Sequence, residues 1–396
     1  MSDYKNVNFL VGDKKFNFEA LNPYDDIIIE FLSEFSDILK KYPNVNNYPD
    51  LITLSFWCRK KNLQKLKSDF SSPKLKKALG ILFHITPSNI PTSFIYSLIF
   101  GMITGNSNIV KLPSKEFDQT EIICKILNKI LFKKKYKKIK KNLKIIRYSS
   151  NEKFTNMVSS IADGRLIWGG DRTIETIKNC NTKNKVTDLI FGDRVSLSVI
   201  NLKHLKKINK LELKKLINNF YNDTFLVDQN GCSSPKIIVW LNGNLRKEKE
   251  IFWSELNKFV KIKYSSPDNA IFEKYTMFTE SLMKLNFISD YKFLNKNLYV
   301  ISLKKIEKSF SDFNGRWGLF FEYNAKNLSE IIQHVDHRCQ TLSYFGLNKN
   351  QILNFLKKNN LNGIDRVVKI GHTMDMSFYW DGYDINNQLT RVVDII

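Results

Sequence analysis

The sequence predicts an α/β protein built around a doubly wound parallel sheet. Segments with strand character alternate with segments whose apolar residues recur at helical spacing between residues 80 and 201. A second alternating series begins at residue 235. The chain has 396 residues, of which 43% are hydrophobic and 13% aromatic, so it is long and apolar enough for two domains.

The N-terminal region is predicted to be helical, because apolar residues recur at helical spacing in residues 27–41 and 50–66. The first alternating series follows it. Its expected strands are 80–86, 108–114, 143–150, 165–170 and 195–201, and its expected helices are 93–105, 120–134, 151–162 and 171–179.

The second series is predicted to form a second α/β unit. It is preceded by an expected helix over 213–223. The expected strands are 235–243, 298–303, 318–324 and 341–347, and the expected helices are 327–337 and 350–358. No internal repeat and no Pro/Ser-rich linker separates the two series, so we expect the domains to abut closely.

The net charge of +23 indicates that nucleic acid or an anionic surface must be considered as a partner. The basic run KKKYKKIKK at 133–141 is either a solvated helix end or a patch that binds phosphates without sequence specificity. The positive field also favours anionic ligands such as coenzyme A or a phosphorylated dinucleotide. A specific nucleic-acid partner is not expected.

Cysteine usage and the N-terminal residues predict a cytoplasmic protein. Five scattered cysteines without a CxxC pair argue against a disulfide framework and a Cys-rich zinc site, and no metal is expected. The start MSDYKNVNF lacks the pattern of a secretory signal. Residues 78–110 carry no fixed charge, but prolines, glycines and polar residues interrupt them, so no membrane span is expected.

The segment FLVDQNGCSSPK at 225–236 places Cys232 in a polar break between two apolar segments. A nucleophilic cysteine needs surroundings that favour the thiolate, and Gly231 would let the backbone approach a substrate closely. No histidine lies within twenty residues, so a Cys–His pair would have to come from the fold. Cys232 is therefore a candidate nucleophile, and a thiol in an ordinary turn is the alternative.

Two further turns follow predicted strands. HITPSNIPTSF at 84–94 places Asn89 at the carboxyl end of a strand, where its amide suits an oxyanion hole, although Ser88 or Asn89 capping a helix explains it equally well. RLIWGGDRT at 165–173 places Gly169 and Gly170 before a helix, where a pyrophosphate could approach the helix N-terminus. A tight strand–helix turn explains the glycines as well, and no GxGxxG motif occurs.

Four segments occur in a telling order along the chain: PSNIP, NIVKLPSK, WGGDRT and NGCSSP. This order resembles the aldehyde dehydrogenase superfamily, whose members carry an oxyanion Asn turn, a cofactor strand, a glycine helix start and a Gly-containing turn with the Cys nucleophile. The longer segments HITPSNIP, GNSNIVKLPSKEF, FYNDTFLVDQNGCSSP and GIDRVVKIG…WDGYD resemble the LuxC-type fatty acyl-CoA reductases over roughly residues 80–385.

The resemblance implies an aldehyde dehydrogenase-like fold with a small β extension that mediates oligomers. The expected parts are a helical cap over 1–75, a dinucleotide-binding domain over 76–205 and a catalytic domain over 206–365 that carries Cys232. Residues 366–396 are expected to return to the cofactor domain or to an oligomer interface. A homo-oligomer is therefore expected.

The resemblance also implies roles for single residues. Cys232 matches the acyl-accepting nucleophile, and Asn89 matches the oxyanion amide. In the cofactor region, Ser114 matches the family serine, and Gly169 and Gly170 fall near the turn that faces the pyrophosphate. Lys111 lies one residue before the family lysine when Pro113 and Ser114 are aligned, and a slip of one residue in a strand reverses the face of the side chain.

Two departures from the superfamily pattern are informative. Ile190 or Phe191 falls where many aldehyde dehydrogenases have a Glu that activates water, so an acyl thioester would be protected from hydrolysis. Lys115 stands where members that prefer NAD often have Glu, and its charge would attract a 2′-phosphate. The expected cofactor is therefore NADPH.

The predicted function is NADPH-dependent reduction of a fatty acyl thioester to an aldehyde through a Cys232 acyl-enzyme. The alternatives are an NAD(P)-dependent enzyme that oxidises an aldehyde to an acid, and a basic nucleic-acid-binding protein. The expected acyl donor is acyl-CoA or an acylated partner, since LuxC-type enzymes commonly work beside an acyl-protein synthetase. His337 could protonate a leaving group or play a structural part.

Overall fold

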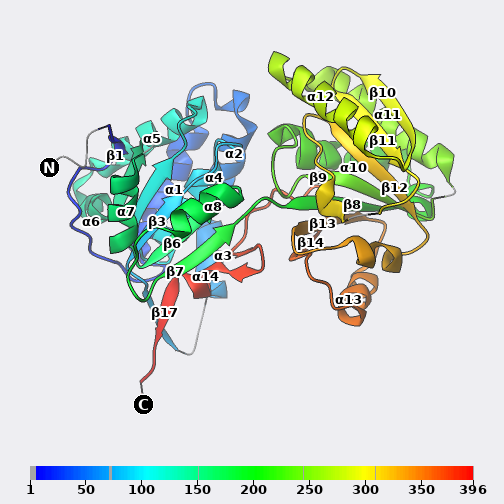
Figure 1. Cartoon of the computed structure of the whole chain (residues 1–396). Coiled ribbons are helices and arrows are strands. Elements are labelled where there is room, and N and C mark those ends of the chain that lie inside the picture. Colours follow the sequence, from blue (N-terminus) through cyan, green and yellow to red (C-terminus); the bar gives the residue numbers. More distant parts are fainter. Residues whose placement is uncertain (1–5, 71–73, 150, 244, 308, 396) are drawn as a thin grey trace. The chain divides into compact units, whose positions relative to one another are not determined.

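The computed structural model describes residues 6–70, 74–149, 151–243, 245–307 and 309–395. The chain divides into two units, each with its own sheet (Figure 1). Unit 1 comprises residues 1–192 and 377–396, and unit 2 comprises residues 193–376. The predicted α/β class is confirmed in both.

The sheet of unit 1 is a six-stranded, mostly parallel sheet. Its order is β1 (Asn8–Val11), β5 (Leu143–Arg147), β4 (Ser107–Leu112), β3 (Ile81–Ile85), β6 (Gly164–Trp168) and β7 (Thr187–Phe191). Only β1 is antiparallel to its neighbour. The chain proceeds from β3 through β4 to β5 on one side and then from β6 to β7 on the other, so the strand order reverses between β3 and β6.

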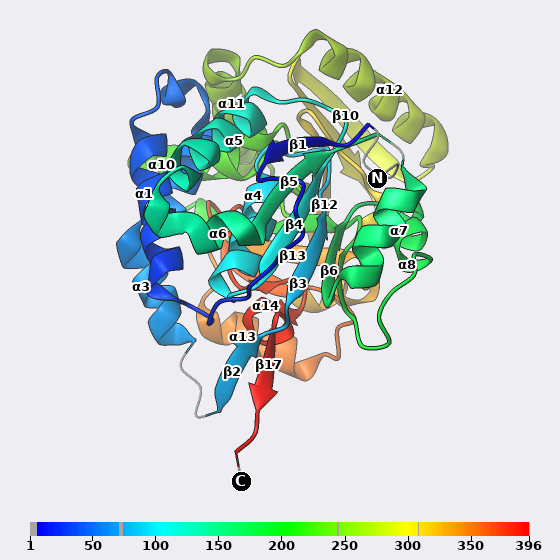
Figure 2. The same cartoon turned by 90° about the vertical axis from the view of Figure 1, so that its left-hand side faces the viewer.

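Helices cover both faces of this sheet (Figure 2). One side carries α4 (Ser93–Ile103), α5 (Asp118–Leu131), η3 (Lys134–Tyr136) and α6 (Lys137–Asn142), and the other carries α7 (Glu152–Ile161) and α8 (Asp171–Lys178). The N-terminal helices are α1 (Asp26–Lys40), η2 (Val45–Asn47), α2 (Pro49–Trp57) and α3 (Lys60–Asp69), and α1 packs on α4 and α5. The helix expected over 50–66 is therefore interrupted at Cys58 and Arg59.

The C-terminal residues of unit 1 form short elements. These are β15 (Tyr379–Trp380), β16 (Tyr383–Asp384), α14 (Ile385–Gln388) and β17 (Thr390–Val393). Strand β17 pairs antiparallel with β2 (Leu75–Ala78), which lies far away in the sequence. Residues 366–376, which the sequence analysis grouped with this segment, belong to unit 2 instead.

The sheet of unit 2 has seven strands. Their order is β10 (Ile288–Asn295), β11 (Leu298–Leu303), β12 (Leu319–Ala325), β9 (Pro235–Leu241), β8 (Val195–Asn201), β13 (Cys339–Phe345) and β14 (Arg366–Lys369). All pairs are parallel except β10 with β11. From β8 the chain continues to β9, its neighbour on one side, and from β13 it continues to β14, which lies in the opposite direction across the sheet. The direction of strand order therefore reverses between β8 and β13.

Alternating side chains of β9 build two separate cores in unit 2. Ile237 and Val239 pack into one cluster, whereas Ile238 and Trp240 pack into another with Phe320. The covering helices are α9 (Leu202–Leu205), α10 (Lys210–Thr224), η4 (Phe225–Val227), α11 (Arg246–Lys263), α12 (Asp268–Lys284), η5 (Phe310–Asp312), η6 (Leu328–His334) and α13 (Lys349–Lys358).

Strand β8 lies in the second sheet, although the sequence analysis placed it in the first domain. Strand β7 was not predicted from the sequence, and only three residues separate its end from the start of β8. A parallel crossover within one sheet needs a dozen or more residues, so two adjacent parallel strands cannot be joined by residues 192–194. The helix expected over 327–337 also differs, because the structure has the 3₁₀ helix η6 there.

Candidate active site

The turn that leads to Cys232 lies between η4 and β9 and is held by contacts within unit 2. Asp228 and Gln229 both adopt positive φ angles, of 54° and 55°. The Asp228 carboxylate accepts a hydrogen bond from the Tyr264 hydroxyl at 2.7 Å. The buried Gln229 amide donates to the carbonyls of Pro235 and Leu319, both at 3.1 Å. These bonds offset the cost of the left-handed backbone and fix the approach to Cys232.

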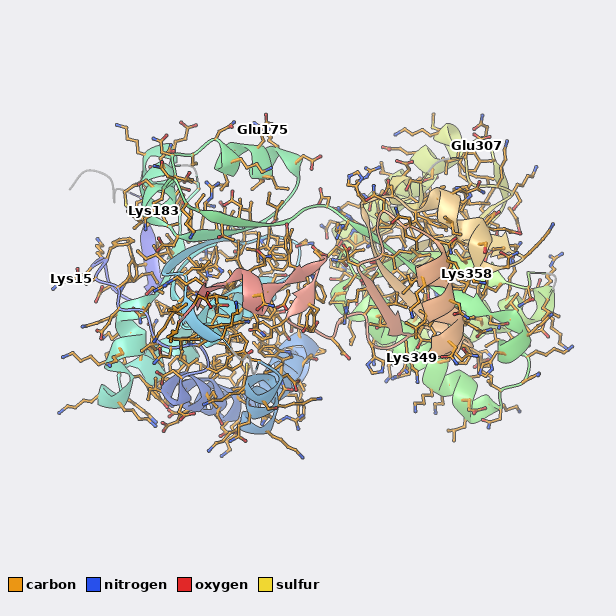
Figure 3. All side chains as sticks on the ribbon, turned by 90° about the horizontal axis from the view of Figure 1, so that it is seen from below. Lys15, Glu175, Lys183, Glu307, Lys349 and Lys358 are labelled. Carbon is orange, nitrogen blue, oxygen red and sulfur yellow. The ribbon has the colours of Figure 1, made fainter. Side chains whose placement is uncertain are left out.

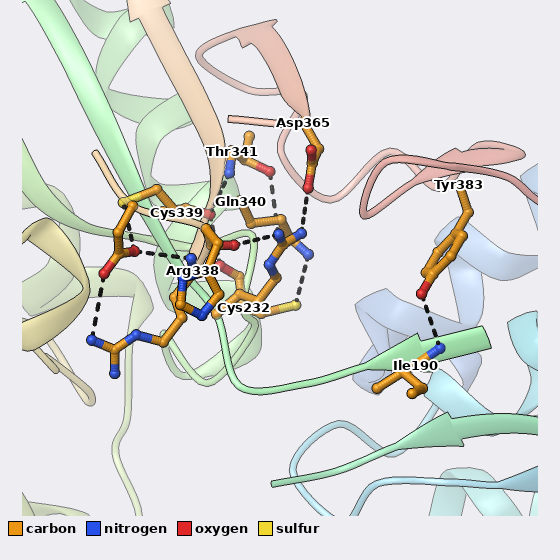
Figure 4. A network of polar contacts seen from close by, with 12 residues as sticks. Ile190, Cys232, Arg338, Cys339, Gln340, Thr341, Asp365 and Tyr383 are labelled. Carbon is orange, nitrogen blue, oxygen red and sulfur yellow. Dashed lines mark hydrogen bonds and ion pairs between the residues drawn. The ribbon is translucent and has the colours of Figure 1, made fainter. Parts of the chain in front are cut away.

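Cys232 itself is partly exposed and is contacted from two neighbouring strands (Figure 4). The Gln340 side-chain amide donates to the Cys232 sulfur at 3.2 Å. The Ser196 hydroxyl donates to the Cys232 carbonyl at 2.7 Å and accepts from the Thr341 N–H at 3.1 Å. Since Ser196 is near the start of β8 and Gln340 near the start of β13, the thiol lies at the amino edge of the second sheet.

A buried lysine lies on the strand that follows Cys232. The Lys236 ammonium donates to the Gln229 carbonyl. Burial, and to a smaller extent the charge of Arg316, lower the pKa of Lys236 to about 7, although interaction with Cys232 opposes the shift. The interaction is reciprocal, so a protonated Lys236 favours the thiolate form of Cys232.

The turn after Cys232 is tied to residues 371–374. The Ser234 hydroxyl donates to the Asp223 carbonyl at 2.6 Å. The Asp223 carboxylate accepts from the N–H groups of Gly371 at 2.6 Å and Thr373 at 3.0 Å. Burial raises the pKa of Asp223 to about 6, against the lowering effect of these two hydrogen bonds. The thiol is therefore held on both sides in a fixed turn.

Asn89 lies in unit 1, in the loop that joins β3 to α4, and is exposed. The N-cap of α4 is Thr92, so neither Ser88 nor Asn89 occupies that position. The preceding Thr86 anchors the loop, because its N–H and its hydroxyl both donate to the Lys111 carbonyl, at 3.2 and 2.7 Å. These bonds hold the start of the loop that carries Asn89 against β4, just after the carboxyl end of β3.

Three predicted cofactor residues of unit 1 lie in β4 or just after it. Ser114 and Lys115 are exposed just after β4. Lys111 lies within β4 and is partly buried, with its ammonium 4.8 Å from the centre of the Tyr148 ring. Burial lowers the pKa of Lys111. The structure thus places Ser114 and Lys115 at the carboxyl edge, whereas the Lys111 side chain packs on an aromatic ring.

Gly169 and Gly170 join β6 to α8, directly at the reversal of the strand order. Gly170 is the N-cap of α8, and no side chain caps this helix. A Cβ atom at Gly169 would lie 3.1 Å from Cβ of Thr173. Asp171 is the first residue of the helix, and its charge would repel a bound anion. The charge of the next residue, Arg172, would attract one. The Gly169 N–H donates to the Phe191 carbonyl at 3.1 Å, so the N–H groups that this turn offers to an anion are those from Gly170 onward.

The end of β7 carries apolar side chains, as the sequence indicated. Phe191 is buried and stacks on Trp168 with 3.8 Å between the ring centroids. The Ile190 N–H donates to the Tyr383 hydroxyl at 3.4 Å (Figure 4). No carboxylate therefore stands at either position that the alignment allows for a water-activating Glu.

The histidines that could assist Cys232 have other surroundings. His84 is fully buried between Ser97 at 2.8 Å and Asn108 at 3.0 Å, and burial lowers its pKa to about 4. His337 is exposed, and its carbonyl accepts a hydrogen bond from Arg194 at 2.5 Å. Cys339 is a buried thiol whose pKa burial raises to about 11. The role of His337 stays a prediction.

The basic run 133–141 forms ion pairs with acidic side chains of unit 1. Lys133 and Lys135 pair with Glu34 at 2.6 and 3.4 Å, and Lys138 and Lys141 pair with Glu19 at 3.9 and 3.5 Å. These pairs reduce the net charge that the run presents, so it offers a weaker phosphate-binding patch than its sequence suggests.

The described parts of the chain lack a metal-binding cluster and a membrane-spanning helix. No group of three or more His, Cys, Asp or Glu side chains there could hold a metal ion. None of the helices within the described ranges combines the length and the apolar character needed to cross a bilayer.

Three residues around Cys232 were missed by the sequence analysis: Ser196, Lys236 and Gln340. Ser196 and Gln340 are more than thirty residues away in the sequence and reach the thiol only through the strand order β9-β8-β13. Lys236 had a local signal, because a lysine inside the apolar segment PKIIVWL is unusual. Gln340 lies in the segment RCQTLSYFGL, which resembles a block near the active site of aldehyde dehydrogenases.

Comparisons with known proteins show what the chain resembles. The sequence profile of a family described as acyl-CoA reductase (LuxC) matches residues 46–392. The long-chain acyl-protein thioester reductase of Aliivibrio fischeri is 21% identical over 298 residues, which are 74% of this chain and 58% of that protein. Long-chain acyl-protein thioester reductase 2 of Photobacterium leiognathi is 23% identical over 180 residues, 45% of this chain and 34% of that protein. The chain thus spans less than two thirds of either relative.

The fold of this chain is similar to that of solved aldehyde dehydrogenase structures. Aldehyde dehydrogenase 21 from Physcomitrella patens, in complex with succinate, has a TM-score of 0.63 at 12% identity, covering 94% of this chain and 86% of that chain. Succinic semialdehyde dehydrogenase from Streptococcus pyogenes, in complex with NADP⁺, has a TM-score of 0.61 at 12% identity, with coverages of 94% and 91%. The predicted aldehyde dehydrogenase-like fold is confirmed.

Proposed function

This chain belongs to the acyl-CoA reductase (LuxC) family, and from this premise we propose that it reduces a fatty acyl thioester to an aldehyde. The observation that carries the proposal is the setting of Cys232. Cys232 is partly exposed, and its sulfur accepts a hydrogen bond from Gln340 and interacts with the buried Lys236. This is the environment that a nucleophilic thiolate requires.

Cys232 is the proposed acyl acceptor. Its thiolate attacks the thioester carbonyl carbon, a new C–S bond forms, and the bond to the sulfur of the donor breaks. The donor leaves as a thiolate that takes up a proton from solvent, so this first transfer requires no oxidant or reductant. The Gln340 amide stabilises the attacking thiolate, and the fixed turn from Asp228 to Ser234 keeps the sulfur in place.

Asn89 is the proposed donor to the carbonyl oxygen as negative charge develops on it. The support is its place in the sequence pattern and its exposed position in a loop that Thr86 anchors. The backbone N–H of Cys232 is the second proposed donor. Donors of this kind act on the transition state more than on the ground state, which is why they accelerate acyl transfer.

The acyl group on Cys232 must survive until it is reduced. Ile190 and Phe191, which lie where a water-activating carboxylate would stand, cannot act as a base. This supports aldehyde formation over the alternative in which the same fold oxidises an aldehyde to a free acid.

The carboxyl edge of the first sheet fits an anionic dinucleotide. The uncapped N-terminus of α8 presents backbone N–H groups, and Gly169 and Gly170 keep the turn free of side chains. We propose that these groups hold the pyrophosphate and that Ser114 and Lys115 bind the ribose and its 2′-phosphate, with Lys111 beside them. When bound, NADPH would supply the hydride that converts the acyl group into an aldehyde.

The acyl donor is proposed from the relatives' names. Both relatives are named acyl-protein thioester reductases, so an acyl group carried by a partner protein is the favoured donor, with acyl-CoA as the second. An acyl-protein synthetase would be the partner that supplies it. A homo-oligomer also remains a proposal, which light scattering of the purified protein would test.

The test is an assay of NADPH oxidation with acyl-CoA donors of 8 to 18 carbons. The proposal predicts that aldehyde, free coenzyme A and NADP⁺ appear in equal amounts with at least one chain length. A parallel reaction with aldehyde and NADP⁺, with and without coenzyme A, addresses the alternative. Formation of free acid without coenzyme A would contradict the proposal and favour aldehyde oxidation.

A further inference from the structure

A cavity of about 710 Å³ opens at the carboxyl edge of the second sheet, within unit 2. It is lined by Phe345 at the end of β13, by Leu347 just after that strand, and by Lys369 and Ile370 at the end of β14. Cys232 lies at the amino edge of the same sheet, so the cavity is separate from the thiol.

The cavity coincides with the reversal of strand order in this sheet. His204 follows β8, and Gly346 follows β13, and these two strands are neighbours whose connections leave in opposite directions. A crevice forms outside the carboxyl ends of parallel strands at such a reversal, and ligands of open α/β sheets bind there. The volume is within the range of small-molecule sites.

The charged side chains of the cavity favour an anion. Lys215 from α10 and Lys369 from β14 both line it. Among the described residues neither lysine forms an ion pair, so both ammonium groups are available. The lining carboxylate of Glu212 accepts the N–H of Asn209 in a helix-capping box at 2.9 Å, which occupies one of its oxygens.

The rest of the lining is largely apolar. Ile208, Leu216 and Phe345 contribute aliphatic and aromatic surface, and Leu216 is almost fully buried. A bare inorganic anion would leave this surface in contact with water. A ligand that carries both an anionic group and an apolar body would satisfy both parts of the cavity.

We propose that this cavity binds a small ligand with one anionic group on an apolar body, held by Lys215 and Lys369. A fatty carboxylate has this chemistry, and a nucleoside monophosphate, with an aromatic base on a polar ribose, tests an anion on a less apolar body. The proposal does not depend on the reductase activity, because the cavity lies at the opposite edge of the sheet from Cys232.

The experiment is isothermal titration of the full-length protein with laurate, below its micelle concentration, and separately with adenosine 5′-monophosphate. The binding variant is K215Q/K369Q, whose two lysines are exposed and can be replaced without disturbing the core. The matched control is K357Q/K358Q, which removes two charges from the far end of α13, where Lys358 is labelled in Figure 3.

We expect at least one probe to bind, with an affinity about tenfold lower in K215Q/K369Q and unchanged in K357Q/K358Q. Laurate binding would identify the ligand as a fatty carboxylate, and monophosphate binding would identify it as a nucleotide. Binding that K215Q/K369Q leaves unchanged, as at a nucleotide site in unit 1, overturns the proposal. Absence of binding by both probes at millimolar concentration overturns it equally.

Discussion

The two sheets of this molecule have the same doubly wound design, but the candidate residues lie at opposite edges of them. In unit 1 the predicted oxyanion residue and the predicted cofactor residues, apart from Lys111 within β4, follow the carboxyl ends of β3, β4 and β6. In unit 2 Cys232 precedes β9 and lies at the amino edge, among the starts of β8 and β13. The carboxyl edge of that second sheet holds a cavity instead.

This difference shows two ways of holding a functional group. The residues of unit 1 are held by short loops, in which Thr86 or Gly170 belongs to the same strand–helix connection as the residue it positions. The thiol of unit 2 is held by Gln340 and Ser196, which come from other strands. Substitutions around the thiol should therefore change its chemistry, and substitutions in unit 1 should change binding or positioning.

Cys232→Ser should have the largest effect. Losing a covalent nucleophile should reduce aldehyde formation by at least about 10³-fold, because the acyl-enzyme can no longer form. The measurement is the rate of NADPH oxidation at saturating acyl donor. Cys180→Ser is the matched control, because Cys180 is another partly exposed thiol and lies in unit 1. Equal activities of the two variants would remove Cys232 from the reaction.

Asn89→Ala should have the next largest effect, a drop on the order of 10²–10³ in kcat, since one oxyanion donor is lost. The KM for the acyl donor should change little, because the amide acts mainly on the transition state. Ser88→Ala, at the exposed neighbouring position, serves as control. Unchanged turnover in the Asn89 variant would remove Asn89 from the mechanism.

Lys236→Met should shift the reactivity of the thiol. Without the Lys236 charge the thiolate is less favoured, so the midpoint of Cys232 alkylation by iodoacetamide should move to higher pH by about one unit. Lys274→Met is the matched control, since Lys274 is buried in the same unit and burial lowers its pKa to about 8 without involvement of Cys232. An identical shift in both variants would contradict the account.

Lys236 also predicts a pH dependence of stability. Its pKa is about 7 in the folded protein and near 10.5 when unfolded, so the unfolded chain binds more protons between these values. The contribution of Lys236 to the free energy of unfolding therefore rises with pH, by up to about 1.4 kcal/mol per pH unit. Thermal unfolding at pH 7.5 and 9 should show a larger gain for the wild type than for Lys236→Met. A gain as large in the variant would show that Lys236 is not titrating in this range.

Lys115→Glu should have the smallest effect. Lys115 is exposed, so its attraction for a 2′-phosphate is weakened by solvent, and we expect the KM for NADPH to rise about tenfold. The KM for NADH should stay within twofold, and Lys153→Glu, at an exposed site on α7, is the control. Equal changes for both cofactors would show that Lys115 does not recognise the 2′-phosphate.

The sequence predicted most elements that depend on local periodicity. Strands β8 and β11 occupy the expected residues 195–201 and 298–303. The turns that carry Asn89, Gly169 and Cys232 also follow or precede the expected strands, because a polar or glycine-containing break in an apolar series is a local signal.

The parts that were missed depend on contacts distant in the sequence. Alternation of strands and helices does not state which strands are neighbours, so Gln340 could not be placed beside Cys232. The short pairs of β2 with β17 and of β15 with β16 contain too few residues for a period to be recognised. The 3₁₀ helix η6 has apolar residues at a spacing that suits an α-helix as well.

The most direct test of the account is mass spectrometry of the protein mixed with acyl donor in the absence of NADPH. Peptide mapping after trapping should find the acyl chain attached to Cys232, and the adduct should disappear when NADPH is added. Attachment to another cysteine, or no attachment with either acyl-CoA or an acylated partner protein, would contradict the central claim.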